Sequence, residues 1–194
     1  MTIKVGINGM GRIGRMVIRA IIESKNKNKN IEIKHINNRS NSEASCALMK
    51  YDSVHGKFNA DLNFDKDHLI INKNKITFSQ ESKIEDINWK KFNVDYVFEC
   101  TGKFNSKDKL LAHIKNGAKK IIVSAPCKDA DKTIVYGVNE NLLSKDDQII
   151  SAASCTTNCL APVANVLNEN FEIEKGFMTT IHAFTSDQRI LDNS

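Results

Sequence analysis

Short runs of hydrophobic residues alternate with glycines and charged clusters along most of this chain. Residues 3–7 alternate between apolar and polar or small side chains, which predicts a strand. Residues 12–25 have apolar side chains at helical spacing instead. We therefore predict a helix there, whose buried face holds Ile13, Val17, Ala20 and Ile21.

The alternation of strand and helix continues through residue 124. Residues 31–36 and 94–100 are apolar runs typical of buried strands, and Ser42 and Ser106 are the expected N-caps of helices over 42–50 and 106–117. Residues 57–79 contain three short strand-like runs separated by polar turns, which predicts an antiparallel insertion. Strands joined by crossover helices form parallel sheets, so we expect an α/β fold with a doubly wound, mostly parallel sheet.

The pattern changes near Ala152. Further strands are predicted over 120–125, 133–138 and 148–154, followed by a helix over 156–170 and one long strand over 176–185. We expect a first domain over residues 1–152 and the start of an α+β second domain over 153–194. That second piece is too short to enclose a core of its own, so we expect it to be truncated.

Composition narrows the functional classes. The chain has 194 residues, 41% of them hydrophobic, and a formal net charge of +5. Its lysines are scattered, which favours a solvated surface over specific nucleic-acid binding and also suits a phosphorylated substrate. No apolar run reaches the ~18 residues of a membrane span, and the N-terminus lacks a signal-peptide pattern. The five cysteines are odd in number and irregularly spaced. We therefore expect free thiols, a cytoplasmic location and no membrane association.

The segment "GINGMGRIG" contains Gly-x-Gly-x-x-Gly between a predicted strand and a predicted helix, as in a Rossmann-type dinucleotide-binding fold. Gly9 permits the tight turn, Gly11 lets the backbone approach a pyrophosphate, and Gly14 lets helix and strand pack closely. The helix N-terminus offers N–H donors and partial positive charge to the phosphates. Arg12 either adds charge to this site or is a solvated surface residue.

The end of the second predicted strand bears on the choice of cofactor. NAD-binding sheets usually carry an acidic residue there, which binds the ribose hydroxyls. This chain has Asn37 and Asn38, followed by Arg39. A neutral Asn38 does not repel the extra phosphate of NADP, and Arg39 could pair with it. A polar turn with no cofactor preference is the alternative.

Cys155 and Cys159 lie four residues apart in "SAASCTTNCLAP" and allow three interpretations. A metal site needs further ligands at regular spacing, and none is nearby, so we expect no metal. A redox pair usually has two intervening residues rather than three. Cys155 lies where a helix should begin, and the positive end of that helix favours a nucleophilic thiolate. Cys159, among apolar neighbours, is expected to be a small buried hydrophobe.

A thiolate nucleophile needs a base, and His182 follows the helix on a segment that could return beside the helix N-terminus. A thiol, an imidazole and a dinucleotide-binding loop together suggest the oxidation of an aldehyde. The thiolate adds to the carbonyl, hydride leaves to the nicotinamide, and a second nucleophile releases the resulting thioester.

Four segments, "INGMGRIGR", "KYDSVHG", "ASCTTNCLAP" and "TTIHAFTSDQ", resemble the phosphorylating glyceraldehyde-3-phosphate dehydrogenase family, and the resemblance covers nearly the whole chain. It implies oxidative phosphorylation of glyceraldehyde 3-phosphate, with Cys155 as nucleophile and His182 as thiol activator, acid and base. The other four cysteines have no catalytic role in the family. Contacts with substrate or inorganic phosphate are implied for Ser154, Thr156, Thr185 and Asp187. Cofactor contacts are implied for Gly9, Gly11, Arg12, Ile13, Gly14, Asn38, Thr101, Gly102 and Ser124.

Two departures from the family pattern concern the cofactor. NAD-specific relatives carry Asp at position 38, and an aliphatic residue and Pro where this chain has Asn193 and Ser194. A small polar pair at that place accompanies NADP use in the family. The expected cofactor is therefore NAD or NADP, with dual use.

The family continues well past Ser194. We therefore expect residues 153–194 to be the truncated start of the catalytic domain, and the 194-residue chain to be inactive alone. The resemblance implies a cytoplasmic, glycolytic homotetramer. Erythrose-4-phosphate dehydrogenase is an open alternative, and so is a truncated chain that acts only as a nucleotide-binding module.

Overall fold

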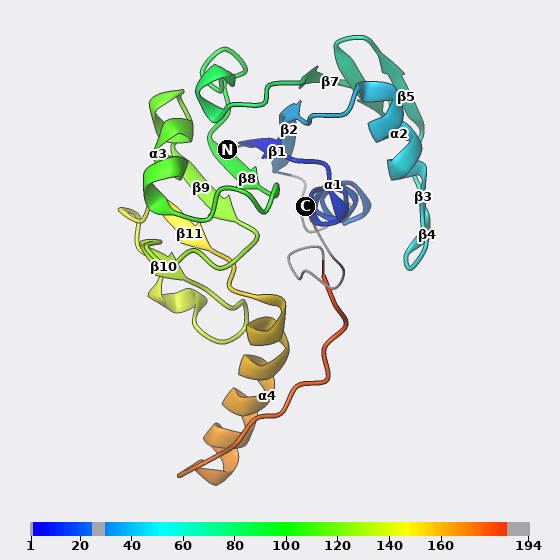
Figure 1. The fold of residues 1–194 in the computed structure, drawn as a ribbon. Helices are drawn as coiled ribbons and strands as arrows, with labels where there is room; N and C mark the ends of the chain where they lie inside the picture. The colour runs from blue at the N-terminus through cyan, green and yellow to red at the C-terminus, as the bar shows by residue number, and fades with distance from the viewer. Residues whose placement is uncertain (1, 25–29, 186–194) are drawn as a thin grey trace, which may run out of the picture.

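The computed structural model describes residues 2–24 and 30–185 and is built around a nine-stranded sheet (Figure 1). The strand order is β10-β11-β9-β8-β1-β2-β7-β6-β5. The strands are β1 (Ile3–Asn8), β2 (Ile31–Asn37), β5 (Leu62–Asp65), β6 (His68–Ile71), β7 (Asn74–Ser79), β8 (Tyr96–Glu99), β9 (Lys120–Val123), β10 (Lys132–Thr133) and β11 (Ile149–Ser151). A separate hairpin pairs β3 (Tyr51–Asp52) with β4 (Gly56–Lys57).

Most strands pair in parallel, because helices connect them. β1 lies between β2 and β8, and β9, β11 and β10 continue the parallel order. The helices are α1 (Arg12–Glu23), α2 (Ser42–Lys50), α3 (Lys107–Lys115) and α4 (Cys155–Phe171), with 3-10 turns η1 (Ile84–Asp86) and η2 (Glu140–Leu142). The predicted α/β fold with a doubly wound sheet is confirmed. The predicted antiparallel strands β5, β6 and β7 extend that same sheet, since β7 pairs in parallel with β2.

Two apolar cores support the sheet. One lies around β1, β2, β6 and β7, where Ile18 of α1 and Met49 of α2 are buried. The other lies around β8, β9 and β11, where Leu110 of α3 packs with the fully buried Trp89. Each core is built where a helix covers the alternating apolar side chains of neighbouring strands, as binary patterning predicts.

The rotation of α1 differs from the predicted one. Ile13 is 50% exposed and Ala20 is exposed, whereas Ile18 is fully buried and Val17 and Ile21 pack partly against the core. The glycine at position 14 accounts for the difference. A Cβ there would lie 1.9 Å from the Gly9 carbonyl oxygen, so this face of the helix lies directly on the backbone of the loop. Close contact at Gly14 brings Ile18, one turn later, into the core.

Two further details differ from expectation. Asn41 rather than Ser42 caps α2, because its side chain accepts a hydrogen bond from the Ala44 N–H, while the Ser42 hydroxyl donates to the Asp65 carbonyl. The strand predicted over 133–138 is reduced to β10, which ends at residue 133. The chain turns away from the sheet there and leaves Tyr136 exposed.

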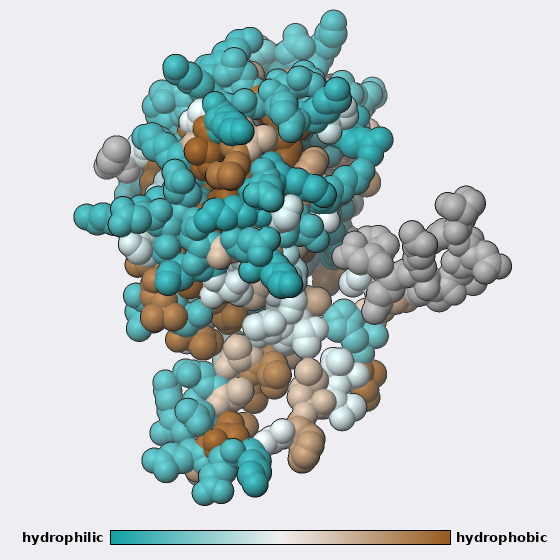
Figure 2. Space-filling view, turned by 60° about the vertical axis from the view of Figure 1, so that its left-hand side comes forward, coloured by the Kyte–Doolittle hydropathy of each residue, from teal (hydrophilic) through white to brown (hydrophobic). Residues whose placement is uncertain are grey.

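Helix α4 projects from the sheet, and the segment after it runs back alongside the helix (Figure 1). The long strand predicted over 176–185 is not formed. A strand needs a hydrogen-bonded neighbour, and within the described residues this extended segment pairs with no other strand. Apolar side chains are exposed on both parts of the projection, among them Val163, Val166, Phe177 and Ile181, and Figure 2 shows apolar patches on it.

No helix among the described residues is long and apolar enough to cross a membrane.

Candidate active site

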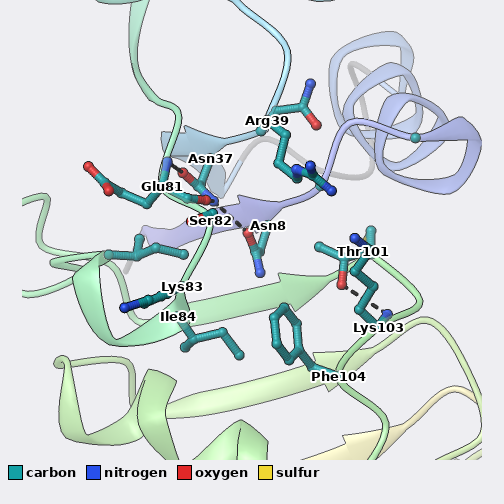
Figure 3. A pocket seen from close by; sticks show the side chains of 15 residues that line it. Asn8, Asn37, Arg39, Glu81, Ser82, Lys83, Ile84, Thr101, Lys103 and Phe104 are labelled. Atoms are coloured by element: carbon teal, nitrogen blue, oxygen red, sulfur yellow. Dashed lines mark hydrogen bonds between the residues drawn. The ribbon is translucent and has the colours of Figure 1, made fainter.

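A groove of about 240 Å³ lies where β1, β2 and β8 reach their carboxyl ends (Figure 3). In doubly wound sheets this is the edge at which ligands bind. Phe104 and Ile84 border the groove across from Arg39. The full lining is Asn8, Gly9, Gly11, Asn37, Asn38, Arg39, Glu81, Ser82, Lys83, Ile84, Ile87, Cys100, Thr101, Lys103 and Phe104.

The glycine loop forms one wall of this groove. Gly9 has a φ of +94°, a left-handed conformation that favours glycine, and a Cβ there would lie 2.9 Å from Thr101 Cγ2. Gly11 is the N-cap of α1, and no atom lies within 4 Å of the Cβ position there. A glycine cap has no side chain to accept from the first helical N–H groups, so these donors stay free for an anion. The loop therefore fits the pyrophosphate of a dinucleotide.

Asn38 lines the groove with its amide held in one orientation. The Met10 N–H donates to Asn38 Oδ1 at 3.1 Å, and Asn38 Nδ2 donates to Ser45 Oγ at 3.1 Å. Because the backbone N–H needs an acceptor, Oδ1 faces the glycine loop and Nδ2 faces α2. Arg39 is exposed at the groove and presents its guanidinium there (Figure 3).

Arg12 is committed to another partner. Its guanidinium forms a two-point ion pair with the Asp52 carboxylate, with both N–O distances 3.0 Å. The N–H groups of His55 and Val54, together with Arg12, hold the pKa of Asp52 well below its usual range. The ion pair ties α1 to the β3–β4 hairpin, while about half of the Arg12 side chain stays exposed.

Of the nine residues predicted to contact the cofactor, four line the groove and five do not. Gly9, Gly11, Asn38 and Thr101 belong to its lining, whereas Arg12, Ile13, Gly14, Gly102 and Ser124 lie outside it. Gly102 follows Thr101 in the turn after β8, and the Ser124 N–H donates to the Glu99 carbonyl at 3.0 Å. The Thr101 hydroxyl makes two hydrogen bonds within the protein: it donates to Glu99 and accepts from the Lys103 N–H.

The thiol and the imidazole lie together at the start of α4. Cys155 is the first residue of this helix, and its Sγ lies 3.3 Å from Nε2 of His182. His182 Nδ1 is hydrogen-bonded to the Ala183 carbonyl oxygen, which can only accept. Nδ1 therefore carries a proton, and Nε2 is left to accept the thiol proton.

This contact changes the acidity of both groups. The hydrogen bond with His182, followed by those from the Thr156 hydroxyl and N–H, lowers the pKa of the Cys155 thiol. The hydrogen bonds with Cys155 and with the Ala183 carbonyl raise the pKa of His182. The two shifts favour proton transfer from sulfur to imidazole. Cys155 is exposed, as a thiolate nucleophile must be.

Of the other four cysteines, three are buried and Cys159 is exposed. Burial raises the pKa of Cys46 and of Cys127, and raises that of Cys100 to about 12, so these three are poor nucleophiles. The prediction that Cys159 is buried is wrong. It is exposed one helical turn from Cys155, and both line a pocket of about 380 Å³ between α4 and the returning segment. Within the described residues, no group of three or more His, Cys, Asp or Glu could hold a metal ion.

The predicted substrate residues occupy different positions. Thr156 lines the pocket of Cys155, and Ser154 is the N-cap of α4, where its Oγ accepts from the Thr157 N–H at 3.0 Å. Ser154 also borders a second hollow, with Lys128 and Thr133. Thr185 is exposed near the end of the described chain. Asp187, Asn193 and Ser194 lie outside the described residues.

Sequence reasoning missed a set of buried polar residues under the groove. Glu99 accepts from Asn8 Nδ2 at 2.6 Å, and Asn37 donates to Asn8 Oδ1 at 2.9 Å. Each of the three ends a parallel strand, β8, β1 or β2. The available signal was Glu99 near the end of the apolar run "VDYVFEC", which also contains Asp95, because a charged residue within a buried strand needs buried partners.

Comparison with known proteins identifies the family. A family model described as "Glyceraldehyde 3-phosphate dehydrogenase, NAD binding domain" matches residues 3–107, more than half of the chain. The chain belongs to the glyceraldehyde-3-phosphate dehydrogenase family. The model of this family's C-terminal domain matches residues 154–194. The match to the NAD-binding domain agrees with NAD as a cofactor of the groove.

Curated members of the family align with nearly all of this chain. It is 49% identical over 192 residues to glyceraldehyde-3-phosphate dehydrogenase of Cereibacter sphaeroides, covering 99% of this chain and 56% of that protein. It is 47% identical over 193 residues to the enzyme of Lactobacillus delbrueckii subsp. bulgaricus, covering 99% and 57%. It is 47% identical over 195 residues to glyceraldehyde-3-phosphate dehydrogenase 2 of Bacillus subtilis (strain 168), covering 100% and 56%. The chain thus spans little more than half the length of these relatives.

Proposed function

We propose that this chain is part of an NAD(P)-dependent, phosphorylating glyceraldehyde-3-phosphate dehydrogenase. The observation that carries the proposal is the 3.3 Å contact between the Cys155 thiol and His182 Nε2 at the start of α4. A thiol with lowered pKa beside a correctly oriented base is the arrangement that covalent aldehyde oxidation requires. Membership of the family supports the substrate class.

In this proposal Cys155 acts first. Its Sγ, as thiolate, adds to the aldehyde carbon, and protonated His182 gives its Nε2 proton to the oxygen, which forms a thiohemiacetal. The nicotinamide ring supplies the hydride acceptor when it is bound. As the hydride leaves the substrate carbon, His182 takes back the hydroxyl proton and a thioester remains on Cys155. Inorganic phosphate then attacks the thioester and releases the thiolate, and the product is an acyl phosphate.

The groove at the glycine loop would hold the cofactor. The free N–H groups at the start of α1 would bind the pyrophosphate, and Asn38 and Arg39 would border the adenosine ribose. We also propose that residues 1–152 form the cofactor domain and that residues 153–194 begin the catalytic domain. We further propose that the complete protein is a cytoplasmic homotetramer in glycolysis, which membership of the family supports.

The proposed function predicts phosphate-dependent turnover by the complete protein. Glyceraldehyde 3-phosphate should reduce more than one equivalent of NAD per Cys155 only when inorganic phosphate or arsenate is present, since the thioester needs a second nucleophile. The measurement is absorbance of the reduced cofactor at each phosphate concentration. A higher kcat/KM with erythrose 4-phosphate would assign the other substrate. Dinucleotide binding without any turnover would contradict the enzyme and leave a nucleotide-binding module.

We also propose that the complete protein uses both NAD and NADP, because position 38 carries no charge. Asp at position 38 would accept from both the Met10 N–H and the Ser45 hydroxyl, so the fold should tolerate it. Its charge would repel the NADP phosphate. We expect Asn38→Asp to lower kcat/KM for NADP about tenfold or more, roughly 1.4 kcal/mol, while the value for NAD is kept.

Asn41→Asp is the matched control for that variant. Asp caps helices as well as Asn does, and the substitution adds the same charge three residues away. It should change the ratio of the two cofactors little. Dual use is refuted if the parent protein already rejects NADP, and the role of position 38 is refuted if Asn38→Asp leaves the ratio of the two kcat/KM values unchanged.

A further inference from the structure

A buried carboxylate lies beneath the groove and has no part in the chemistry described above. Glu99, the last residue of β8, is 1% exposed. Its Oε2 accepts from Asn8 Nδ2 at 2.6 Å and from His113 Nε2 at 3.1 Å. Its Oε1 accepts from the Thr101 N–H at 2.8 Å and from the Thr101 hydroxyl at 2.5 Å.

The partners of Glu99 are arranged as donors. Trp89 Nε1–H donates to His113 Nδ1 at 2.8 Å, so Nδ1 is the accepting nitrogen and the proton of the neutral ring is on Nε2. Asn37 donates to Asn8 Oδ1, which leaves the Asn8 NH₂ facing Glu99. Each carboxylate oxygen thus receives two hydrogen bonds. This arrangement suits an ionised carboxylate, which would otherwise be costly to bury.

These hydrogen bonds reach the glycine loop from two sides. Asn8 directly precedes Gly9, and the Asn8 carbonyl accepts from the Cys100 N–H at 2.8 Å. On the other side, Thr101 Cγ2 lies 2.9 Å from where a Gly9 Cβ would be. The bond from the Thr101 hydroxyl to Glu99 fixes the rotamer that turns this methyl group toward Gly9. Glu99 therefore fixes the residues on both sides of the left-handed turn.

We propose that Glu99 is a positioning residue that clamps the glycine loop for dinucleotide binding. The inference rests on the proposed use of the groove by a dinucleotide. A clamped loop presents the N–H groups at the start of α1 in one arrangement, so binding does not have to order them. Glu99 acts through Asn8 and Thr101 and is not itself a contact of the cofactor.

Glu99→Gln tests the clamp, because the amide keeps the shape and presents an NH₂ group to residues that are themselves donors. We expect the dissociation constant for NAD, measured by titration calorimetry on the complete protein, to rise about tenfold. Asp131→Asn is the matched control. Asp131 accepts from the N–H groups of Gln148 and Ile149 at 2.8 Å each, between β10 and β11, away from the groove. It should lower Tm without changing the dissociation constant.

Two further readouts keep the test decisive if Glu99→Gln folds poorly. Thr101→Val removes only the hydroxyl and should raise the dissociation constant severalfold, about half the effect in free energy. Without ligand, amide hydrogen exchange at residues 9–13 should be faster in Glu99→Gln and in Thr101→Val than in Asp131→Asn. A parent protein that binds no dinucleotide would refute the proposed function. If the parent binds dinucleotide, two outcomes would refute the clamp. One is that Glu99→Gln and Thr101→Val bind as tightly as the parent, and the other is that Asp131→Asn weakens binding as much as they do.

Discussion

The Cys155→Ser variant of the complete protein should lose aldehyde oxidation, with kcat/KM falling on the order of 10⁴-fold or more. The thiol is the group whose pKa is lowered by His182 and Thr156, and a serine hydroxyl in the same place stays protonated. The measurement is the initial rate of cofactor reduction as a function of substrate concentration at saturating phosphate. Dinucleotide binding should persist, because Cys155 lies outside the groove lining.

Cys159→Ser is the control for this substitution. Cys159 is exposed in the same pocket, one helical turn away, so the variant makes the same chemical change beside the reaction centre. It should keep most of the activity. In the parent protein, iodoacetamide below pH 7 should label Cys155 first, since the three buried cysteines have raised pKa values. Equal labelling of Cys155 and Cys159, or an active Cys155→Ser variant, would contradict the assignment of the nucleophile.

The sequence predicted the sheet well, because its evidence is local. Short apolar runs, turn residues and helical spacing predicted the parallel strands β1, β2, β8 and β9 and the antiparallel insertion β5–β7, whereas the short β3–β4 hairpin was not predicted. The rotation of α1 was mispredicted, since it depends on the contact between Gly14 and the Gly9 carbonyl, which periodicity does not reveal. The strand expected over 176–185 failed for a related reason. Alternating residues describe a strand only when a neighbouring strand pairs with them.

In the candidate site, too, local features could be predicted from the sequence and long-range contacts could not. Cys155 and His182 could be paired from sequence, because a helix start and a returning segment are local features, and the structure brings them within 3.3 Å. The Arg12–Asp52 ion pair and the Asn8–Glu99 hydrogen bond join residues 40 and 91 positions apart. The first follows from how the β3–β4 hairpin lies against α1, and the second follows from the pairing of β1 with β8. Glu99, an acid near the end of the apolar run "VDYVFEC", was the available hint of the contacts around it.

The His182→Asn variant should slow the reaction on the order of 10²–10⁴-fold, the usual contribution of a general acid–base group. His182 is placed both to remove the thiol proton and to return a proton to the substrate oxygen, so kcat as well as kcat/KM should fall. The alkylation rate of Cys155 gives an independent readout that needs no cofactor or substrate. His68→Asn, a change at a partly exposed ring paired with Asp65, controls for the loss of any imidazole.

The direction of the pH effect follows from the two shifts. His182 lowers the pKa of the Cys155 thiol, so the parent thiol is ionised at a lower pH than an ordinary one. Without the imidazole that pKa rises, and the pH profile of iodoacetamide alkylation should move toward higher pH. At pH 7 the His182→Asn variant should therefore react more slowly, and the two proteins should converge once both thiols are ionised. A profile that coincides with that of the parent would mean that His182 does not activate the thiol, even if turnover falls. A shifted profile with unchanged turnover would leave its thiol-activating role and exclude the acid–base role.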